Sequence, residues 1–326
     1  MTSIKQIFPG MAVAFIVALA AKFLGEHYGA PTMLYALLLG LSMNFIYDSE
    51  QCKSGIDFTG KRILRFGVAL LGLRIALGDI TAFGWKPLAL ILVGVISTIL
   101  IGIIIAKLLG LEKRFGMLTG GAVAICGASA AMAISAVMPR EKGLERDTIF
   151  AVVGVTTLST VAMIVYPIIT NWMGMDDRES GIFLGATIHD VAQVVGAGYS
   201  ISDEAGDLAT VTKLMRVTFL VPVVMVIALS FKMSGNTSDG KTPTLPVFLI
   251  AFIMLVGINS VGIVPTGLKE FLIELSRFSL IAAIAAIGIK SRMKDLLGVG
   301  LAPVALMALE TIWLAALVLI ALPLVQ

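Results

Sequence analysis

Charged residues are scarce in this sequence. They make up 14% of the 326 residues, against about 25% in ordinary soluble domains. Hydrophobic residues reach 58%, and the mean hydropathy is +0.99. So few polar side chains cannot cover a water-facing surface. The composition therefore excludes an ordinary soluble enzyme and indicates an integral membrane protein.

Cysteine and histidine are also rare. Cys52 and Cys126 are the only cysteines, and His27 and His189 are the only histidines. These numbers argue against a disulfide framework, a cysteine metal cage and a histidine-rich metal site. The phosphate-binding motif G-x-x-x-x-G-K-S/T does not occur, which argues against ATP-driven transport by this chain alone. A net charge of +3 gives no basic surface for nucleic acid.

Long apolar blocks separated by short polar segments fill most of the chain. At about 20 residues per crossing, the sequence accommodates about eleven transmembrane helices and leaves no room for a soluble domain. We therefore predict one all-α polytopic domain over residues 1–326, with loops at residues 48–60 and 232–245. The predicted crossings are residues 7–24, 31–47, 63–80, 87–109, 115–138, 148–173, 181–199, 214–231, 246–264, 278–289 and 301–324.

Small residues dominate the block at residues 115–138, which contains Gly120, Gly121 and Gly127. Each glycine costs about 1 kcal/mol in a helix interior relative to alanine. Two explanations remain open. The small residues let neighbouring helices pack closely, or the helix unwinds near the middle of the membrane so that backbone groups line a substrate cavity.

The block at residues 277–294 is a second candidate for an interrupted helix. Its apolar core, residues 278–289, is too short to span a bilayer alone, so the helix must either break or extend through a charged stretch. Arg114-Phe115-Gly116 and Arg277-Phe278-Ser279 open the two blocks alike. With the first helix set aside, the blocks are the fourth and ninth of ten helices, five positions apart, and this odd separation reverses their orientation, as an inverted repeat requires.

His189 and Asp190 lie in the middle of an apolar block. Charges at this depth are costly and are functional candidates by default. On a continuous helix, Thr187 and Asp190 would face one side, and His189 and Gln193 another. The pair is either a structural one that adjacent helices satisfy, or part of a substrate, proton or cation site.

Basic residues near the helix ends have two interpretations. Arg65 and Arg74 lie about 13 Å apart along a helix, so they cannot share one depth in the membrane. Each either binds an anion or anchors a helix end at the interface. Lys213 and Arg216 have the same two interpretations. We expect Glu310, in the last block, to pair with a basic neighbour.

Three segments resemble a known family. They are Ala124-Ile-Cys-Gly-Ala-Ser-Ala130, Gly185-Ala-Thr-Ile-His-Asp-Val-Ala-Gln-Val-Val195, and Lys213-Leu-Met-Arg-Val217 with Pro222. In these segments the chain is similar to the bacterial YeiH-like inner-membrane proteins, the sulfate exporter family, and the similarity extends over the full length. Asp190 is a departure, because we expect glutamate there in many members.

The resemblance implies a secondary transporter with a fold like the sodium–proton antiporters and bile-acid symporters. In that fold two discontinuous helices cross in a core subdomain, and a scaffold subdomain is interleaved with it in sequence. The resemblance also implies export of a small anion, sulfate or a sulfonate, across the bacterial inner membrane. We expect a lipid bilayer and a coupling proton or sodium ion as partners, and no enzyme activity, cofactor, metal or nucleic acid. A homodimer is left open.

The expected substrate site combines half-helix N-termini with arginine charge. Ser129 donates a hydrogen bond to the anion, and the core rocks against the scaffold. A cation–proton antiporter remains an alternative, as does an intramembrane enzyme or sensor that uses Ser129 and His189 without a G-x-S-x-G elbow. The expected substrate-binding residues are Cys126, Gly127, Ala128, Ser129, Thr187, His189, Gln193, Arg65 and Arg74, and the expected coupling residues are His189 and Asp190.

Overall fold

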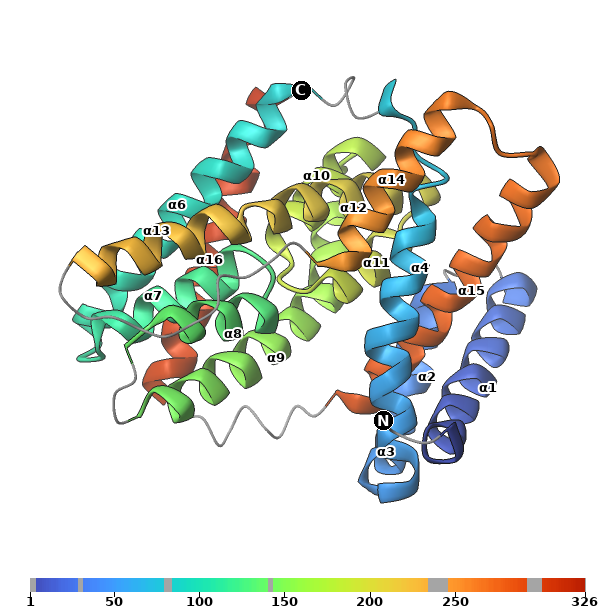
Figure 1. The fold of residues 1–326 in the computed structure, drawn as a ribbon, viewed down its shortest axis with the longest axis horizontal. Coiled ribbons are helices and arrows are strands. Elements are labelled where there is room, and N and C mark those ends of the chain that lie inside the picture. Colours follow the sequence, from blue (N-terminus) through green and yellow to red (C-terminus); the bar gives the residue numbers. More distant parts are fainter. Residues whose placement is uncertain are drawn as a thin grey trace. The chain divides into compact units, whose positions relative to one another are not determined.

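The computed structural model describes residues 4–28, 32–78, 84–139, 143–233, 246–291 and 301–325. Within these ranges every regular element is helical (Figure 1), as expected where lipid forces a chain to satisfy its own backbone groups. By length and composition, six helical stretches could cross a membrane: Gln6–Tyr28, Trp85–Leu108, Leu144–Trp172, Asp203–Met233, Thr266–Lys290 and Leu301–Leu324. The prediction of an all-α polytopic membrane protein is confirmed.

The chain divides into two compact units that interleave in sequence. Unit 1 contains Met1–Gly84, Val195–Leu208 and Pro246–Arg292. Unit 2 contains Trp85–Val194, Ala209–Leu245 and Met293–Gln326. Two helices, α11 and α12, each contain a boundary, so the turn between them belongs to unit 1 and their outer ends belong to unit 2.

In unit 1, α15 lies beside α1, α2 and α4 (Figure 1). Glycine permits close approach of two helix pairs: a Cβ on Gly10 would lie 1.8 Å from the Cys52 carbonyl oxygen, and one on Gly40 would lie 2.4 Å from that of Ala285. The elements of unit 1 are α1 (Ile4–Tyr28), α2 (Thr32–Ser42), η1 (Asn44–Asp48), α3 (Glu50–Phe58), η2 (Thr59–Ile63), α4 (Leu64–Leu71), α14 (Val247–Val261) and α15 (Thr266–Lys290).

The predicted loop at residues 48–60 is wrong, because α3 occupies most of it. This segment is amphipathic: Glu50 and Lys53 are exposed, whereas Gly55 and Ile56 are buried in the contact with α1. Polar composition alone therefore indicated a loop where one face of a helix is in fact packed. The second predicted loop, residues 232–245, lies outside the described residues from position 234 onward.

Unit 2 contains the helices that carry the candidate site. In it α7 packs closely along α6, while α16 contacts α6, α7, α9 and α10. Its elements are α6 (Trp85–Leu108), α7 (Lys113–Ala124), α8 (Ala128–Val137), α9 (Leu144–Trp172), α10 (Asp177–Thr187), the first part of α11 (Val191–Gly198), most of α12 (Asp203–Thr218), α13 (Leu220–Met233), α16 (Leu301–Ala321) and η4 (Leu322–Leu324).

Two predicted crossings of unit 2 are interrupted. The block at residues 115–138 breaks between Ala124 and Ala128, so the unwinding that its glycines suggested is confirmed. The block at residues 181–199 breaks between Thr187 and Val191, which the sequence did not indicate. Both breaks are short, with three residues between the two helical halves.

For the described part of residues 277–294, the second of the two alternatives is confirmed: the helix does not break, since α15 runs from Thr266 to Lys290. The helix extends through charged residues ahead of Phe278. Glu274 pairs with Lys22 at 2.8 Å, and Arg277 pairs with Asp203. These charges have partners, so they do not end the helix. Residues 292–294 lie outside the described part of the chain.

Candidate functional site

The two helix breaks of unit 2 lie against each other. A Cβ built on Gly127 would lie 3.6 Å from the carbonyl oxygen of His189 and 3.7 Å from its Cβ, so residues from both breaks are in contact. Gly127 has φ +64° and ψ −129°, a conformation that only glycine adopts readily. The glycine thus allows the chain to turn from α7 into α8 at this contact.

Two buried cations from α12 bind the carbonyl ends of the broken helices. Lys213 Nζ donates to the Ile125 carbonyl at 2.7 Å and to the Ile188 carbonyl at 2.8 Å, one in each break. The last carbonyls of a helix have no partner within it and carry partial negative charge. Lys213 therefore satisfies the end of α7 and the end of α10 together.

Arg216 serves the same two ends from one turn further along α12. It donates to the carbonyls of Ala186 at 2.7 Å and Ile188 at 3.2 Å, and also to those of Val123 and Ala124. Lys213 and Arg216 are 0% and 1% exposed. Because both side chains are buried, neither residue anchors a helix end at the membrane interface. Their N–H groups donate to carbonyls at the C-terminal ends of α7 and α10. Sequence reasoning named both residues but had no signal for this role.

The N-terminal ends of the second halves differ from each other. Asp190 caps α11, since its Oδ1 accepts the N–H of Ala192 at 3.1 Å. The Asp190 N–H in turn donates to Ser159 Oγ of α9 at 3.1 Å. At α8, in contrast, the N-cap residue is Gly127, which has no side chain that could cap the helix. Ser129, in the first turn of α8, is exposed. The first turn of α8 is thus an uncapped positive helix end.

Two polar atoms near the start of α11 are buried and have no partner among the described residues: His189 Nδ1 and Gln193 Oε1. Their side chains are otherwise fixed. His189 Nε2 lies 3.0 Å from Thr311 Oγ1, and Gln193 Nε2 donates to Thr160 Oγ1 at 2.9 Å. Buried polar atoms in proteins nearly always have a partner, so these two mark a place for water, an ion or a ligand.

The predicted helix faces at this site are wrong because the backbone is interrupted there. Thr187 ends α10, where its hydroxyl donates to the Phe183 carbonyl at 2.6 Å, while Asp190 precedes α11. A periodicity of 3.6 residues does not apply across such a break. The structure nevertheless places one group of predicted residues in unit 2: Cys126, Gly127, Ala128, Ser129, Thr187, His189, Asp190 and Gln193.

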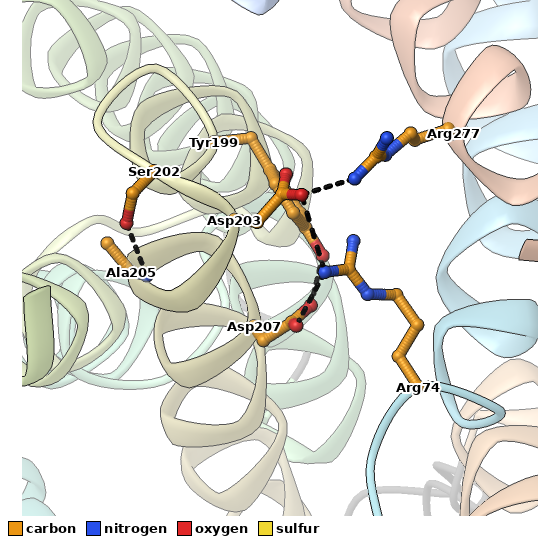
Figure 2. A network of polar contacts seen from close by, with 7 residues as sticks. All are labelled: Arg74, Tyr199, Ser202, Asp203, Ala205, Asp207 and Arg277. Atoms are coloured by element: carbon orange, nitrogen blue, oxygen red, sulfur yellow. Dashed lines mark hydrogen bonds and ion pairs between the residues drawn. The ribbon is translucent and has the colours of Figure 1, made fainter. Parts of the chain in front are cut away.

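The two predicted arginines belong to unit 1. Arg65 is exposed, and its guanidinium lies 5.8 Å from the centre of the Phe248 ring. Arg74 Nη2 lies 3.1 Å from Asp207 Oδ2 and 3.6 Å from Asp203 Oδ2 (Figure 2). Two carboxylates therefore compensate the charge of Arg74. The structure does not assemble either arginine with the helix breaks in one unit.

Figure 2 shows the network around Arg74 in unit 1. Asp203 also pairs with Arg277 of α15, and the Tyr199 hydroxyl donates to Asp207. The network ties the turn between α11 and α12 to other segments of the same unit. From the sequence alone Arg74 was a candidate for anion binding, because its acidic partners lie far away in the chain.

Glu310 of α16 differs from its expected role. Its Oε1 accepts a hydrogen bond from Thr119 Oγ1 at 2.8 Å, and its side chain is fully buried. Among the described residues it forms no ion pair, and Oε2 has no partner. The expectation of a basic neighbour is therefore wrong.

Comparisons with known proteins agree with a membrane protein. UPF0324 membrane protein CT0845 of Chlorobaculum tepidum is 52% identical and aligns with 96% of this chain and 88% of its own. UPF0324 membrane protein TauZ of Paracoccus pantotrophus is 50% identical over 97% of this chain and 94% of its own.

Among solved structures, the sodium proton antiporter MjNhaP1 of Methanocaldococcus jannaschii aligns with 96% of this chain and 97% of its own. The identity is 14% and the TM-score 0.29, which is too low to carry an argument. The family model described as Conserved hypothetical protein 698 matches residues 9–307. Together with the relatives above, this match confirms the family resemblance seen in the motifs. The chain is a multi-pass membrane protein that belongs to the conserved hypothetical protein 698 family, together with the UPF0324 membrane proteins.

Proposed function

We propose that this protein is a secondary active transporter that moves a small anion, sulfate or a sulfonate, by alternating access, and that it is not an enzyme. One observation carries the proposal: two interrupted helices meet in unit 2, and buried cations satisfy their carbonyl ends. Broken helices that meet at a polar site are typical of secondary transporters, because unwound backbone at membrane depth must line a protein cavity.

The charges around the breaks favour an anion over a cation. Lys213 and Arg216 bring two positive charges, and Asp190 brings one negative charge that caps α11. The uncapped first turn of α8 adds partial positive charge and N–H donors. In this proposal the anion lies at Gly127 and Ala128, where the exposed Ser129 hydroxyl donates a further hydrogen bond.

The proposed site extends to the polar atoms that lack a partner. In this proposal His189 Nδ1 and Gln193 Oε1 face a water or the substrate. Cys126 lies in the first break, and Thr187 is the last residue of α10 before the second break. His189 and Asp190 would couple transport to a proton. We leave Arg65 and Arg74 out of the proposed site, which is built from unit 2 alone. In unit 1, carboxylates already compensate the charge of Arg74.

In this proposal the two units move relative to each other during transport. Unit 2, which contains the breaks, corresponds to the core, and unit 1 corresponds to the scaffold. The core would move against the scaffold so that the site opens to one side of the membrane and then to the other. The helices α11 and α12 connect the two units covalently, so they would transmit or absorb this motion.

Purified protein in liposomes tests the proposal through uptake of radiolabelled sulfate and methanesulfonate, with and without a pH gradient. We expect uptake by the wild type and a loss in Ser129→Ala. The matched control is Ser135→Ala in the same helix, because the Ser135 hydroxyl bonds only locally, to the Met132 carbonyl at 3.0 Å. If folded protein moves neither anion, the substrate assignment is wrong.

A cation–proton antiporter is a second candidate, favoured by the Asp190 carboxylate beside the breaks. The same liposomes distinguish the two functions through sodium-dependent proton flux. Antiport predicts that Asp190→Asn abolishes this flux while Ser129→Ala leaves it unchanged. Anion transport predicts that the wild type shows no sodium-dependent proton flux.

A further inference from the structure

Glu310 is a buried acid of unit 2 that has no countercharge among the described residues. It is 0% exposed, its side-chain partner is Thr119, and its Oε2 has no partner in the part of the chain that the structure describes. An ionised carboxylate is costly in such a place unless a cation or several donors compensate it. A purely structural interhelical contact would need only a hydroxyl or an amide at this position.

The space around Glu310 is shaped for its carboxyl group. A Cβ built on Gly102 of α6 would lie 2.4 Å from Glu310 Oε1 and 2.6 Å from the Gly116 carbonyl oxygen. Glycine at position 102 therefore leaves the room that the acid occupies. One turn earlier in α6, Thr98 is fully buried, and its hydroxyl has no partner among the described residues. Two unpartnered polar atoms thus lie in the contact region of α6, α7 and α16.

The charged residues of the helices packed against α16 lie toward the helix ends, and none forms an ion pair with Glu310 in the part of the chain that the structure describes. His189 is a titratable group that contacts this segment of α16 through Thr311. The remaining titratable groups on these helices are Lys86 and Lys107 of α6, Lys113 and Arg114 of α7, Glu145, Arg146, Asp147 and Tyr166 of α9, and Asp177, Arg178 and Glu179 of α10.

We propose that Glu310 binds and releases a proton in the transport cycle and shares the coupling role proposed above for His189 and Asp190. This inference rests on the proposed transport function. The carboxylate takes a proton from water on one side of the membrane, forming an O–H bond, and the acid returns it to water on the other side after the core has moved. No other bond changes. Thr311, the next residue of α16, contacts His189 at 3.0 Å, so the helix that carries the acid also touches the second break.

Charge determines the direction of the coupling. An ionised Glu310 adds negative charge to the unit that receives the anion, and protonation removes it. Proton binding therefore favours anion binding, and by linkage the anion favours the proton to the same extent. The expected outcome is that proton and anion travel in the same direction. An exchange of anion against proton would contradict this sign.

The test compares wild type, Glu310→Gln and the control Glu145→Gln in liposomes. Glu145 is an exposed acid at the start of α9, so its substitution changes the same chemical group outside the buried site. We expect Glu310→Gln to lose sulfate uptake driven by a pH gradient by about tenfold or more, while it keeps sulfate exchange without a gradient. Glu145→Gln keeps both activities. A Glu310→Gln protein that responds to the gradient like the wild type overturns the proposal.

Infrared spectroscopy provides a readout that does not depend on transport. A protonated carboxylic acid at neutral pH gives a C=O band, which we expect in wild type and Glu145→Gln and expect to be absent in Glu310→Gln. If the wild type moves no anion but shows this band, the proposed transport function is wrong, although Glu310 is still shown to bind a proton. If wild type and Glu310→Gln have the same carboxylic acid band at every pH, the acid at 310 takes up no proton and the inference fails.

Glu310→Asp keeps the inference testable if Glu310→Gln does not fold. Aspartate preserves an acid in the same pocket, and we expect the variant to keep both the band and the response to the gradient. Suppose that folded Glu310→Asp exchanges sulfate and responds to the pH gradient like the wild type, but lacks the carboxylic acid band. This result contradicts the proposal, because the gradient response then needs no protonated acid at this position.

Discussion

Lys213 and Arg216 hold the unwound segments of unit 2 through bonds to carbonyl oxygens of both breaks. Both side chains are buried, and their positive charges lie beside helix C-terminal ends that carry partial negative charge. A buried charge with these bonds is stable, whereas removal of the side chain leaves several carbonyls without a donor. At the scale of single residues, stability and the proposed anion site therefore depend on the same cations.

Lys213→Ala tests this role. The substitution deprives the carbonyls of Ile125 and Ile188 of a donor and leaves a cavity, so we expect the free energy of unfolding to fall by about 3 kcal/mol. Thermal unfolding in detergent measures the change. Lys232→Ala, at an exposed position in α13, is the control and should melt like the wild type. Equal melting of both variants would show that Lys213 does not hold the breaks.

At the scale of helices, the break between α7 and α8 depends on one backbone conformation. Gly127→Ala places a Cβ at φ +64°, ψ −129°, which costs about 1–3 kcal/mol. We expect lower stability and loss of the stabilisation that sulfate gives the wild type in a thermal shift assay, because Gly127 is the N-cap residue directly before α8. Gly267→Ala is the control, since a Cβ at that position in α15 meets nothing within 4 Å. Normal sulfate stabilisation of Gly127→Ala would contradict the placement of the anion.

The sequence predicts some of these elements and not others. The first break could be predicted because glycines and small residues cluster in residues 115–138. The second was not predicted, because Gly185 and Ala186 before Ile188 are a weaker signal than the cluster of small residues in the first block. A lysine 25 residues further along the chain holds it. Likewise, the apolar core of α15 looks too short in the sequence because charged residues precede it. The sequence does not show that one of them, Glu274, pairs with Lys22 of a distant helix.

The candidate site shows the same limit. His189 and Asp190 could be identified from the sequence, since a polar pair in an apolar block is unusual. Their partners could not, because Ser159 and Thr311 are ordinary hydroxyl residues in other helices. For Arg74 and Glu310 the sequence did not reveal the partners: Arg74 contacts Asp207, and Glu310 contacts Thr119. Tertiary contacts decide which of several buried polar residues meet.

For the whole molecule, the two units interleave in sequence, and we propose that unit 2 binds the anion while unit 1 is the scaffold. The Arg74 network fixes the turn between α11 and α12 within unit 1, while the outer ends of these helices carry the breaks and the cations of unit 2 (Figure 2). A change in this network should therefore affect the transport rate without changing the affinity for the anion.

Arg74→Gln tests this separation. Without the guanidinium charge, Asp203 and Asp207 lose a cation, and we expect slower sulfate uptake with an unchanged sulfate concentration for half-maximal thermal stabilisation. Arg65→Gln, at an exposed position of the same unit, should leave both quantities unchanged. A loss of sulfate affinity in Arg74→Gln would mean that Arg74 binds the substrate after all.

Sulfate counterflow distinguishes a carrier that has a sulfate site from a protein that has none. Liposomes that contain the protein and are preloaded with unlabelled sulfate are diluted into a trace of radiolabelled sulfate, so that only a carrier with a sulfate site accumulates label against its gradient. The account predicts transient accumulation by the wild type and little by Ser129→Ala, with Ser135→Ala unchanged. Absence of accumulation by folded wild-type protein, with both sulfate and methanesulfonate, would contradict it.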